Sequence, residues 1–329
     1  MTYRFAAGIV SFLLFVSPSY AVDLDRPDVQ AFIKSMVSEH DYDRAKLRDI
    51  LSKAEMKRSM IDLISKLAEK TLSWAEYRPI FMTKERVNAG ATFWRENRDA
   101  FQKISASTGV PIEIIVSIIG VETYFGRITG GHRVLDALAT LAFFYPPRAK
   151  FFRGELEQFL LLIREENMQP DNAFGSYAGA MGRPQFMPSS YRAYAVDSTG
   201  DGKRDIWNNW EDVAGSIANF LNAHGWKSGE EVVSQATIGG RWVGPFPDNV
   251  LMPEETVSSL SKKGVMFSTD LPIDGVSQLL TLQGSDGDEH WVGFHNFFVI
   301  TRYNRSVMYA LVVYQLGQEI ALKVESGAP

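Results

Sequence analysis

The hydrophobic positions of this chain recur at helical spacing over most of its first 230 residues. Apolar side chains three and four positions apart lie on one face of a helix, so such segments are predicted to form amphipathic helices that pack on a core. Asp136 is predicted to cap one of them, and Tyr309, Val312, Val313 and Leu316 share one face of the last. The predicted helices cover residues 26–39, 43–70, 85–104, 135–141, 155–166, 212–224 and 306–321.

The pattern changes from about residue 231, where short β-like runs alternate with Gly, Pro and Asp. Short runs rich in β-branched and aromatic residues between turn residues predict strands. These runs are Trp242–Gly244, Gly264–Phe267, Gln278–Leu282 and Phe297–Ile300. The sequence therefore predicts an α+β fold that is mainly α, with a small β-rich lobe.

The segment from Ile114 to Gly126 is almost wholly apolar and carries one acid, Glu122. Ile118 and Ile119 lie on the same helix face one turn earlier, so the carboxyl should point where a core side chain points. Burial and the negative end of the helix dipole both raise a carboxyl pKa, which would keep Glu122 protonated near pH 7 as a proton donor. The alternative is a surface Glu on the one polar stripe of the helix.

Residues 1–21 differ from the rest of the chain. They begin with a positive residue, Arg4, continue with an apolar run over 6–16 and end in Ser19-Tyr20-Ala21, a small-x-small pattern. This arrangement is typical of a secretory signal peptide. The alternative is an uncleaved membrane anchor, but the apolar run is shorter than the roughly 20 residues that cross a bilayer.

The sequence contains no cysteine, which excludes disulfides, thiol chemistry and a lipid anchor attached to a cysteine. We therefore expect a soluble periplasmic product once the signal peptide is cut. With 45% hydrophobic and 22% charged residues in 329, the composition is that of an ordinary globular protein. The net charge of −5 is mildly acidic, so the chain is not expected to bind nucleic acid.

A glycine-rich segment from Gly175 to Tyr191 is the second candidate for chemistry. Its glycines let backbone approach a ligand closely, and its Gln, Phe, Met and Ser side chains combine apolar area with hydrogen-bonding groups. Sugars need this combination because they present apolar ring faces and polar edges. The alternative is a buried turn between helices. No Gly-Lys-Ser/Thr follows, so the segment is not a phosphate loop.

The third candidate is an aspartate-rich loop with the spacing of an EF-hand, whose hard oxygen ligands suit calcium. Its oxygen donors are the side chains of Asp197, Thr199, Asp201 and Asp205 and the main-chain carbonyl of Lys203. Asn208 stands where an EF-hand has its closing Glu, so Glu211 or Asp212 would have to close the site. The alternative is an Asp- and Gly-rich surface turn.

Other catalytic signatures are absent from the sequence. The five histidines form no His-Glu-x-x-His pair and there is no Gly-x-Ser-x-Gly, so neither zinc hydrolysis nor a serine hydrolase is predicted. Glycosidases ordinarily pair two carboxylates. No second acid stands at a convincing position, because Asp136 is predicted as a helix cap and Asp197 and Asp201 as metal ligands.

Four motifs in order resemble the membrane-bound lytic murein transglycosylase B family, over residues 28–322. They are Gly120-Val121-Glu122-Thr123, the run Tyr-Ala-Gly-Ala-Met-Gly-x-x-Gln-Phe-Met-Pro-Ser-Ser-Tyr from Tyr177, the aspartate loop, and Thr301-Arg302-Tyr303-Asn304. The resemblance implies a lysozyme-like catalytic core, a helical flanking domain and a small β-rich lobe. The implied division is a signal peptide over 1–21, the flanking domain over 22–105, the core over 106–230 with the loop 197–212, the lobe over 231–302 and a C-terminal helix over 303–329.

The family's activity, as the resemblance implies it, is cleavage of the β-1,4 bond between N-acetylmuramic acid and N-acetylglucosamine in peptidoglycan, leaving a 1,6-anhydromuramoyl end. By this resemblance Glu122 is the catalytic acid, no cofactor takes part in catalysis, and a structural calcium site closes on Asp212. The implied partners are glycan strands and proteins of cell-wall synthesis or remodelling. The substrate-groove positions fall on Ser176, Gln185, Phe186, Met187, Tyr303, Asn304 and Tyr309, with weaker matches at Tyr77 and Arg148, and on Phe220, where a tyrosine would add a hydroxyl contact.

Two features depart from the family pattern. Its namesake carries a lipid-anchoring cysteine that this chain lacks, and the segment after Trp207 is one residue longer. Three other functions remain open on the sequence alone. A water-using muramidase would use the same acid, a non-catalytic peptidoglycan-binding protein would keep the same groove, and a calcium-responsive protein would need only the aspartate loop.

Overall fold

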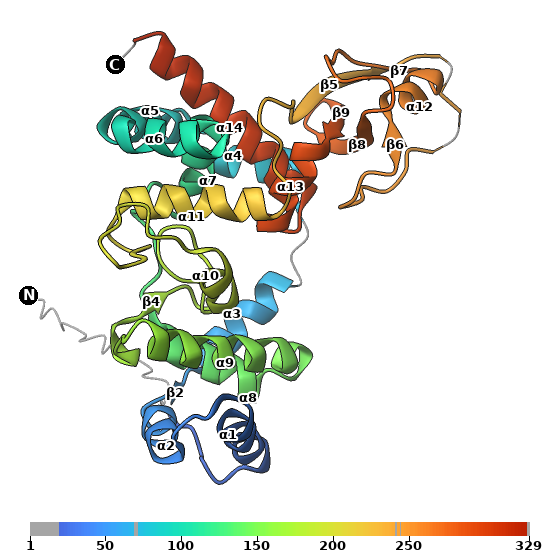
Figure 1. The fold of residues 1–329 in the computed structure, drawn as a ribbon. Helices are drawn as coiled ribbons and strands as arrows, with labels where there is room; N and C mark the ends of the chain where they lie inside the picture. The colour runs from blue at the N-terminus through green and yellow to red at the C-terminus, as the bar shows by residue number, and fades with distance from the viewer. Residues whose placement is uncertain (1–19, 69–71, 241, 244, 328–329) are drawn as a thin grey trace, which may run out of the picture.

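The computed structural model describes residues 20–68, 72–240, 242–243 and 245–327, and Figure 1 shows its fold. The predicted signal peptide lies outside the described residues except for Tyr20–Ala21. These two residues form β1, which pairs antiparallel with β2 (Glu55–Met56).

The helices form two blocks, one above the other in Figure 1. The glycine-rich segment and α10 (Pro188–Tyr194) lie between the blocks. The lower block holds α1 (Pro27–His40), α2 (Arg44–Ser52), α3 (Arg58–Ala68), α8 (Val134–Phe144) and α9 (Ala149–Glu165). The upper block holds α4 (Trp74–Phe81), α5 (Lys84–Glu96), α6 (Arg98–Thr108), α7 (Ile112–Thr123), α11 (Trp210–Ala223), α13 (His295–Tyr303) and α14 (Val307–Glu325).

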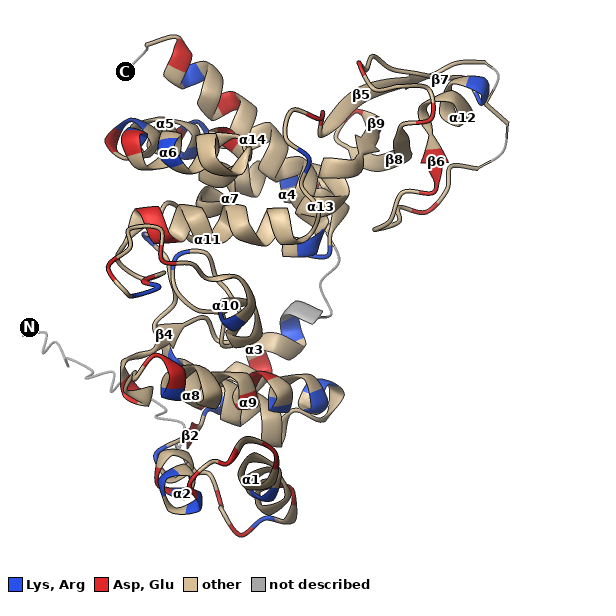
Figure 2. Cartoon of the chain, viewed as in Figure 1, with Lys and Arg blue, Asp and Glu red and all other residues tan. Residues whose placement is uncertain are grey.

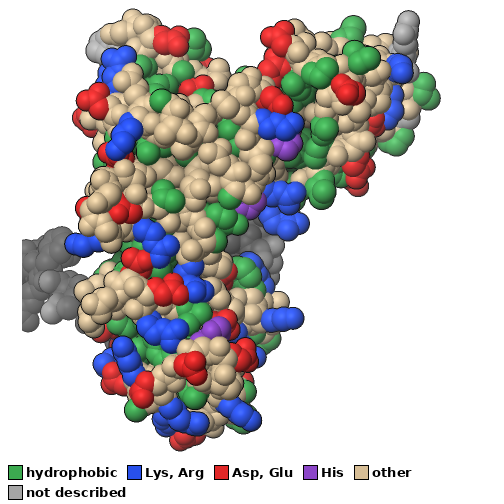
Figure 3. Space-filling model, in the orientation of Figure 1, with side chains coloured by type: hydrophobic (Ala, Val, Ile, Leu, Met, Phe, Trp, Pro, Cys, Tyr) green, Lys and Arg blue, Asp and Glu red, His purple; other side chains and the backbone are tan. Residues whose placement is uncertain are grey.

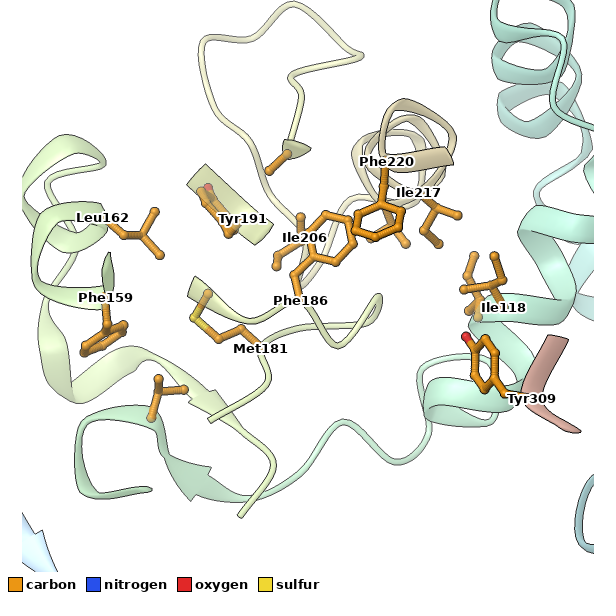
Figure 4. Packing of buried hydrophobic residues seen from close by; sticks show 14 of the residues in the cluster. Ile118, Phe159, Leu162, Met181, Phe186, Tyr191, Ile206, Ile217, Phe220 and Tyr309 are labelled. Carbon is orange, nitrogen blue, oxygen red and sulfur yellow. The ribbon is translucent and has the colours of Figure 1, made fainter. Parts of the chain in front are cut away.

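One hydrophobic core runs through both blocks. Figure 4 shows part of it as a row of side chains from Phe159 of α9, through Phe186 and Phe220, to Ile118 of α7. Every residue of α7 from Ile114 to Gly120 is buried, which explains why this helix is apolar all round. The charges lie on the outer elements, where Figure 2 shows both signs interspersed.

The short elements lie in the connections between helices. They are β3 (His132–Arg133), the 3₁₀ turns η1 (Pro146–Arg148) and η2 (Pro170–Asn172), and β4 (Phe174–Gly175). β3 pairs with β4, which fixes the start of the glycine-rich segment against the segment that follows α7.

The β-rich lobe is a five-stranded antiparallel sheet in the order β6-β8-β9-β5-β7. Its elements are β5 (Val233–Ile238), β6 (Glu255–Thr256), α12 (Val257–Lys262), β7 (Val265–Met266), β8 (Val276–Gly284) and β9 (Gly287–Phe294). Leu260, Leu279 and Phe294 belong to its own small core. The lobe projects from the side of the helical body next to α13, and Figure 3 shows it overhanging that side.

The mainly helical α+β class is confirmed, and several local predictions are corrected. The predicted helix over 43–70 is divided by β2, and that over 85–104 ends and restarts at Asn97. Asp136 is not a cap: it lies buried inside α8, accepts the N–H of Glu55 and pairs with Arg133. The hydrogen bond from Glu55 in β2 compensates for burial of this carboxylate. The hydrophobic pattern of the helix that carries Asp136 does not predict this contact.

The predicted strands are partly right. Gly264–Phe267 contains β7 and Gln278–Leu282 lies within β8, whereas β5, β6 and β9 are not among the predicted strands. Trp242 and Val243 form no strand, and Gly244 lies outside the described residues. Phe297–Ile300 is helical, in α13, and wholly buried, because a short continuous apolar run does not distinguish a buried helix from a buried strand.

Across the described ranges, no single helix is long and apolar enough to cross a membrane. By length and composition alone, α6 and α7 together would be long and apolar enough, but the two helices are bent by 118° where they meet.

Candidate active site

Glu122 is the second-last residue of α7, and its carboxyl lies against α14. The hydroxyl of Tyr309 donates a hydrogen bond to Glu122 Oε1 at 2.7 Å. Tyr309 is only 1% exposed, so this donor is fixed by the surrounding core. Figure 4 shows Tyr309 next to Ile118 of α7, one turn before the acid.

Burial raises the pKa of Glu122 to about 7, and the hydrogen bond from Tyr309 opposes this rise. Desolvation disfavours the charged form of a carboxyl, whereas a donor to its oxygen favours that form. The residue as a whole keeps partial exposure although its carboxyl is enclosed. At neutral pH the group is thus poised to give up a proton and to take one back.

Three tyrosines from three helices line the surroundings of Glu122. Tyr303 and Tyr309 are stacked, with ring centroids 6.4 Å apart and planes 8° apart. The Tyr303 hydroxyl donates to the carbonyl of Pro184 at 2.7 Å. Burial, reinforced by the charge of Glu122, raises the pKa of Tyr303 and Tyr309 well above the ordinary value and that of Tyr77 to about 12. All three hydroxyls therefore stay protonated as hydrogen-bond donors.

The glycine-rich segment folds as a series of tight turns that begin at Gly175. A Cβ there would lie 2.0 Å from the carbonyl oxygen of Ala180, so only glycine fits. The Ser176 hydroxyl oxygen accepts the N–H groups of Ala178 and Ala180 at 3.3 and 3.1 Å. Gln185, with φ of 53°, donates its amide to the carbonyls of Thr129 and Gly182. Both polar side chains thus stabilise the turns on which they lie.

Aromatic packing connects this segment to the tyrosines. The Phe220 ring of α11 lies 4.9 Å from that of Tyr303 and 5.9 Å from that of Phe186. Figure 4 shows Phe186 and Phe220 next to each other. Phe186 and Phe220 are 2% and 6% exposed, and Met187 is partly buried. The two phenylalanines therefore pack against the Tyr303 ring and hold it in place.

The structure thus gathers Glu122, Tyr77, Tyr303 and Tyr309 with Phe186 and Phe220 behind them. Of the other predicted groove residues, Ser176, Gln185 and Met187 lie on the glycine-rich segment, and the remaining two are exposed. Asn304 is exposed at the C-terminal end of α13. Arg148 is exposed on η1, with its guanidinium over the rings of Phe151 and Phe152 at 4.4 and 5.3 Å.

The aspartate loop is closed by its own hydrogen bonds. Asp197 accepts the N–H groups of Gly200, Asp201 and Gly202. Asp212, fully buried in the first turn of α11, accepts those of Ser198, Thr199 and Asp205. Carboxylate, hydroxyl and carbonyl donors fit calcium in kind. Among the described residues, however, no group of three or more His, Asp or Glu side chains is gathered as metal ligands.

The comparisons with known proteins agree with this architecture. The family model described as a transglycosylase SLT domain matches residues 24–318. The chain is 44% identical to the membrane-bound lytic murein transglycosylase B of Escherichia coli (strain K12) over 307 residues, covering 91% of this chain and 84% of that protein.

Solved structures of similar proteins superpose over most of the chain. The soluble lytic transglycosylase SltB1 from Pseudomonas aeruginosa matches with a TM-score of 0.83 and 46% identity, covering 92% of this chain and all of that one. The Escherichia coli lytic transglycosylase Slt35 in complex with calcium matches with a TM-score of 0.81 and 42% identity, covering 92% and 95%.

The mainly helical body with its β-rich lobe is the fold of a lytic transglycosylase, and the chain belongs to the transglycosylase SLT domain family. It is accordingly an enzyme that cleaves peptidoglycan. The resemblance drawn from the four sequence motifs is confirmed.

Proposed function

We propose that Glu122 is the single acid and base of this enzyme, and that it cleaves the β-1,4 bond between N-acetylmuramic acid and N-acetylglucosamine. The observation that carries the proposal is the enclosed carboxyl, with a pKa raised to about 7 by burial and one oxygen held by Tyr309. Such a group holds its proton at neutral pH and is still acidic enough to release it.

In the first step Glu122 protonates the glycosidic oxygen. The Tyr309 hydroxyl occupies Glu122 Oε1 as a donor, so the transferable proton resides on Oε2. As the C1–O bond breaks, its electron pair goes to the departing oxygen, and positive charge develops at C1 of the muramoyl ring. Tyr309 then stabilises the carboxylate that Glu122 has become.

In the second step the substrate supplies the groups that a second carboxylate would otherwise provide. The carbonyl oxygen of the 2-acetamido group bonds to C1, and the muramoyl 6-hydroxyl oxygen then displaces it. The Glu122 carboxylate takes the hydroxyl proton, so the acid is regenerated and the product carries a 1,6-anhydro ring. Burial raises the pKa of Glu122 and the Tyr309 hydroxyl lowers it, and among the described residues no second carboxylate adds to these two causes, in keeping with this chemistry.

The glycan strand would lie along the surface that includes Tyr77, Tyr303 and the glycine-rich segment. Ser176 and Asn304 are assigned to orient the acetamido group, the first because its hydroxyl hydrogen is not used by the two N–H groups that it accepts. Gln185, Phe186, Met187 and Phe220 shape and support the groove, and Arg148 extends it with a positive charge.

Replacement of Glu122 by Gln tests the proposal. The amide keeps the shape of the side chain and an oxygen for Tyr309, but it has no proton to give. We expect unchanged binding to purified peptidoglycan and turnover reduced at least about a thousandfold, since loss of general acid and base removes 10²–10⁴-fold each. Turnover near that of the parent would refute the role of Glu122.

We further propose that the aspartate loop binds a structural calcium ion. Asp197, Thr199, Asp201, Asp205 and the Lys203 carbonyl supply ligands, and buried Asp212 closes the site. The ion would stabilise the loop and the start of α11 without entering catalysis, as the calcium complex of Slt35 suggests for this chain. Calcium added to chelator-treated protein should raise the melting temperature, and the Asp197→Asn variant should lose that rise. An unchanged melting temperature would show that calcium does not stabilise the loop.

The periplasm is the proposed location, because residues 1–21 have the pattern of a signal peptide and the substrate is the cell wall. The mature chain should begin at Val22 and be recovered in the periplasmic fraction. A chain that keeps residues 1–21 and stays with the membrane would contradict this.

A further inference from the structure

The backbone directly after Glu122 is strained. Tyr124, Phe125 and Gly126 follow the end of α7 with φ angles of 49°, 58° and 80°. Non-glycine residues rarely occupy this left-handed region, and they persist there only where the surroundings hold them. Whatever holds this turn also fixes the last turn of α7, which carries the acid.

Thr123 is the first of the holding contacts. Its hydroxyl oxygen accepts the N–H of Gly126 at 3.1 Å, and its hydrogen lies between the carbonyl oxygens of Arg183 at 3.1 Å and Ile119 at 3.2 Å. Thr123 is 1% exposed, so water does not replace these bonds. The residue next to Glu122 is thereby connected to the glycine-rich segment.

The Arg183 side chain continues this connection to α11. Its guanidinium lies over the Trp210 ring at 3.6 Å from the centroid, and Nη1 donates to the carbonyl of Asn208 at 3.1 Å. A Cβ on Gly126 would lie 2.7 Å from the Trp210 ring and 3.4 Å from Arg183 Nε. The stacked side chains of Arg183 and Trp210 therefore cover the strained turn at Gly126.

We propose that Arg183 is a positioning residue for Glu122. Its carbonyl holds Thr123, and its planar side chain is anchored on Trp210 and Asn208, so the end of α7 is locked between the glycine-rich segment and the start of α11. This inference rests on the proposed role of Glu122 as the acid. Loss of the anchor would loosen the turn, admit water to the carboxyl and bring its ionisation closer to that of an ordinary Glu.

The test compares Arg183→Ala and Arg183→Lys with Arg127→Ala in the full mature chain acting on purified peptidoglycan. Lysine keeps the charge of arginine but not its planar stack. Arg127 is a matched control, because it lies over the Tyr124 ring of the same turn at 5.0 Å but is exposed. The titratable groups that face Glu122, namely Tyr77, Tyr303 and Tyr309, are intact in all three variants.

For both Arg183 variants we expect kcat to fall about 10- to 100-fold with KM within about twofold, as a misplaced catalytic group produces. The alkaline limb of the kcat profile should also move to lower pH, whereas Arg127→Ala should keep the parent profile. Should Arg183→Ala not fold, Arg183→Lys decides. The inference would be overturned if a folded Arg183 variant kept the kcat and the pH profile of the parent. It would also be overturned if the loss of kcat were no larger than the loss of folded protein. Full activity of Glu122→Gln would instead overturn the role of Glu122 itself.

Discussion

The Tyr309 hydroxyl and the Glu122 carboxyl form a 2.7 Å hydrogen bond, although 187 positions separate them in the chain. The bond joins the second-last residue of α7 to the first turns of α14, which pack against each other. Burial alone would raise the pKa of Glu122 further, and Tyr309 brings it back to about 7. The pair therefore sets the proton affinity that the proposed role of Glu122, as acid and then as base, requires.

Replacing Tyr309 by Phe should raise the pKa of Glu122, because the bond that favours the carboxylate is lost. The acid would then hold its proton to higher pH, and the alkaline limb of the kcat profile should move upward. We expect kcat at neutral pH to fall about 10- to 100-fold, since the oxygen that takes the proton back is no longer oriented. A kcat profile measured from pH 5 to 9 checks both effects.

Tyr314→Phe is the control for this variant. It removes a phenol from the same helix whose raised pKa comes from burial and from Glu231 and Glu113 rather than from Glu122. Its profile should match that of the parent. A downward shift in Tyr309→Phe would contradict the assignment of Tyr309 as the group that stabilises the ionised acid.

Glu122→Gln should stabilise the fold at alkaline pH. The pKa of Glu122 is about 7 in the folded protein against an ordinary 4.5, so its neutral form stabilises the fold below pH 4.5, and this contribution is lost as pH rises toward 7. Glutamine does not ionise, so its advantage over Glu should grow across that window toward a limit of about 3.4 kcal/mol, from 1.36 kcal/mol per pKa unit. Urea unfolding at pH 4.5 and pH 8 measures the difference, and a stability gap that does not change with pH would contradict the buried acid.

The glycine-rich segment should tolerate no side chain at its start. Gly175→Ala places a Cβ 2.0 Å from the backbone oxygen of Ala180. We expect the free energy of unfolding to fall by more than about 2 kcal/mol and the activity to be lost. Gly154→Ala is the matched control, because Gly154 is an exposed position of α9 and nothing lies within 4 Å of a Cβ placed there. There alanine should stabilise the protein by about 0.5–1 kcal/mol. Thermal unfolding of both variants measures this contrast.

The helices could be predicted from sequence where one amphipathic face packs on one core, as in α1 and α14. The pattern failed where burial removes it. Phe297–Ile300 is buried on every side of α13, so no polar face marks its period. Asp136 is a buried acid whose partner, the N–H of Glu55, lies 81 positions away, so a helix cap was the simpler explanation.

The candidate site also contains residues that the sequence points to and residues that only the structure reveals. Glu122 stands out in the sequence because it is a single acid near the end of an apolar helix, and the structure places its carboxyl against α14. Arg183 could not, because its contacts with Trp210 and Asn208 cross the aspartate loop and its own neighbours are glycine and proline. A positive residue inside a glycine-rich segment is a faint signal, and only the folded chain shows what it holds.

The central claim is that one acid and the substrate's own groups complete the reaction without water. Digestion of purified peptidoglycan in water labelled with heavy oxygen, followed by mass analysis of the released muropeptides, tests it most directly. We predict products that are lighter by one water than the hydrolysed form and carry no label. Labelled reducing ends would contradict the account and make the enzyme a hydrolytic muramidase.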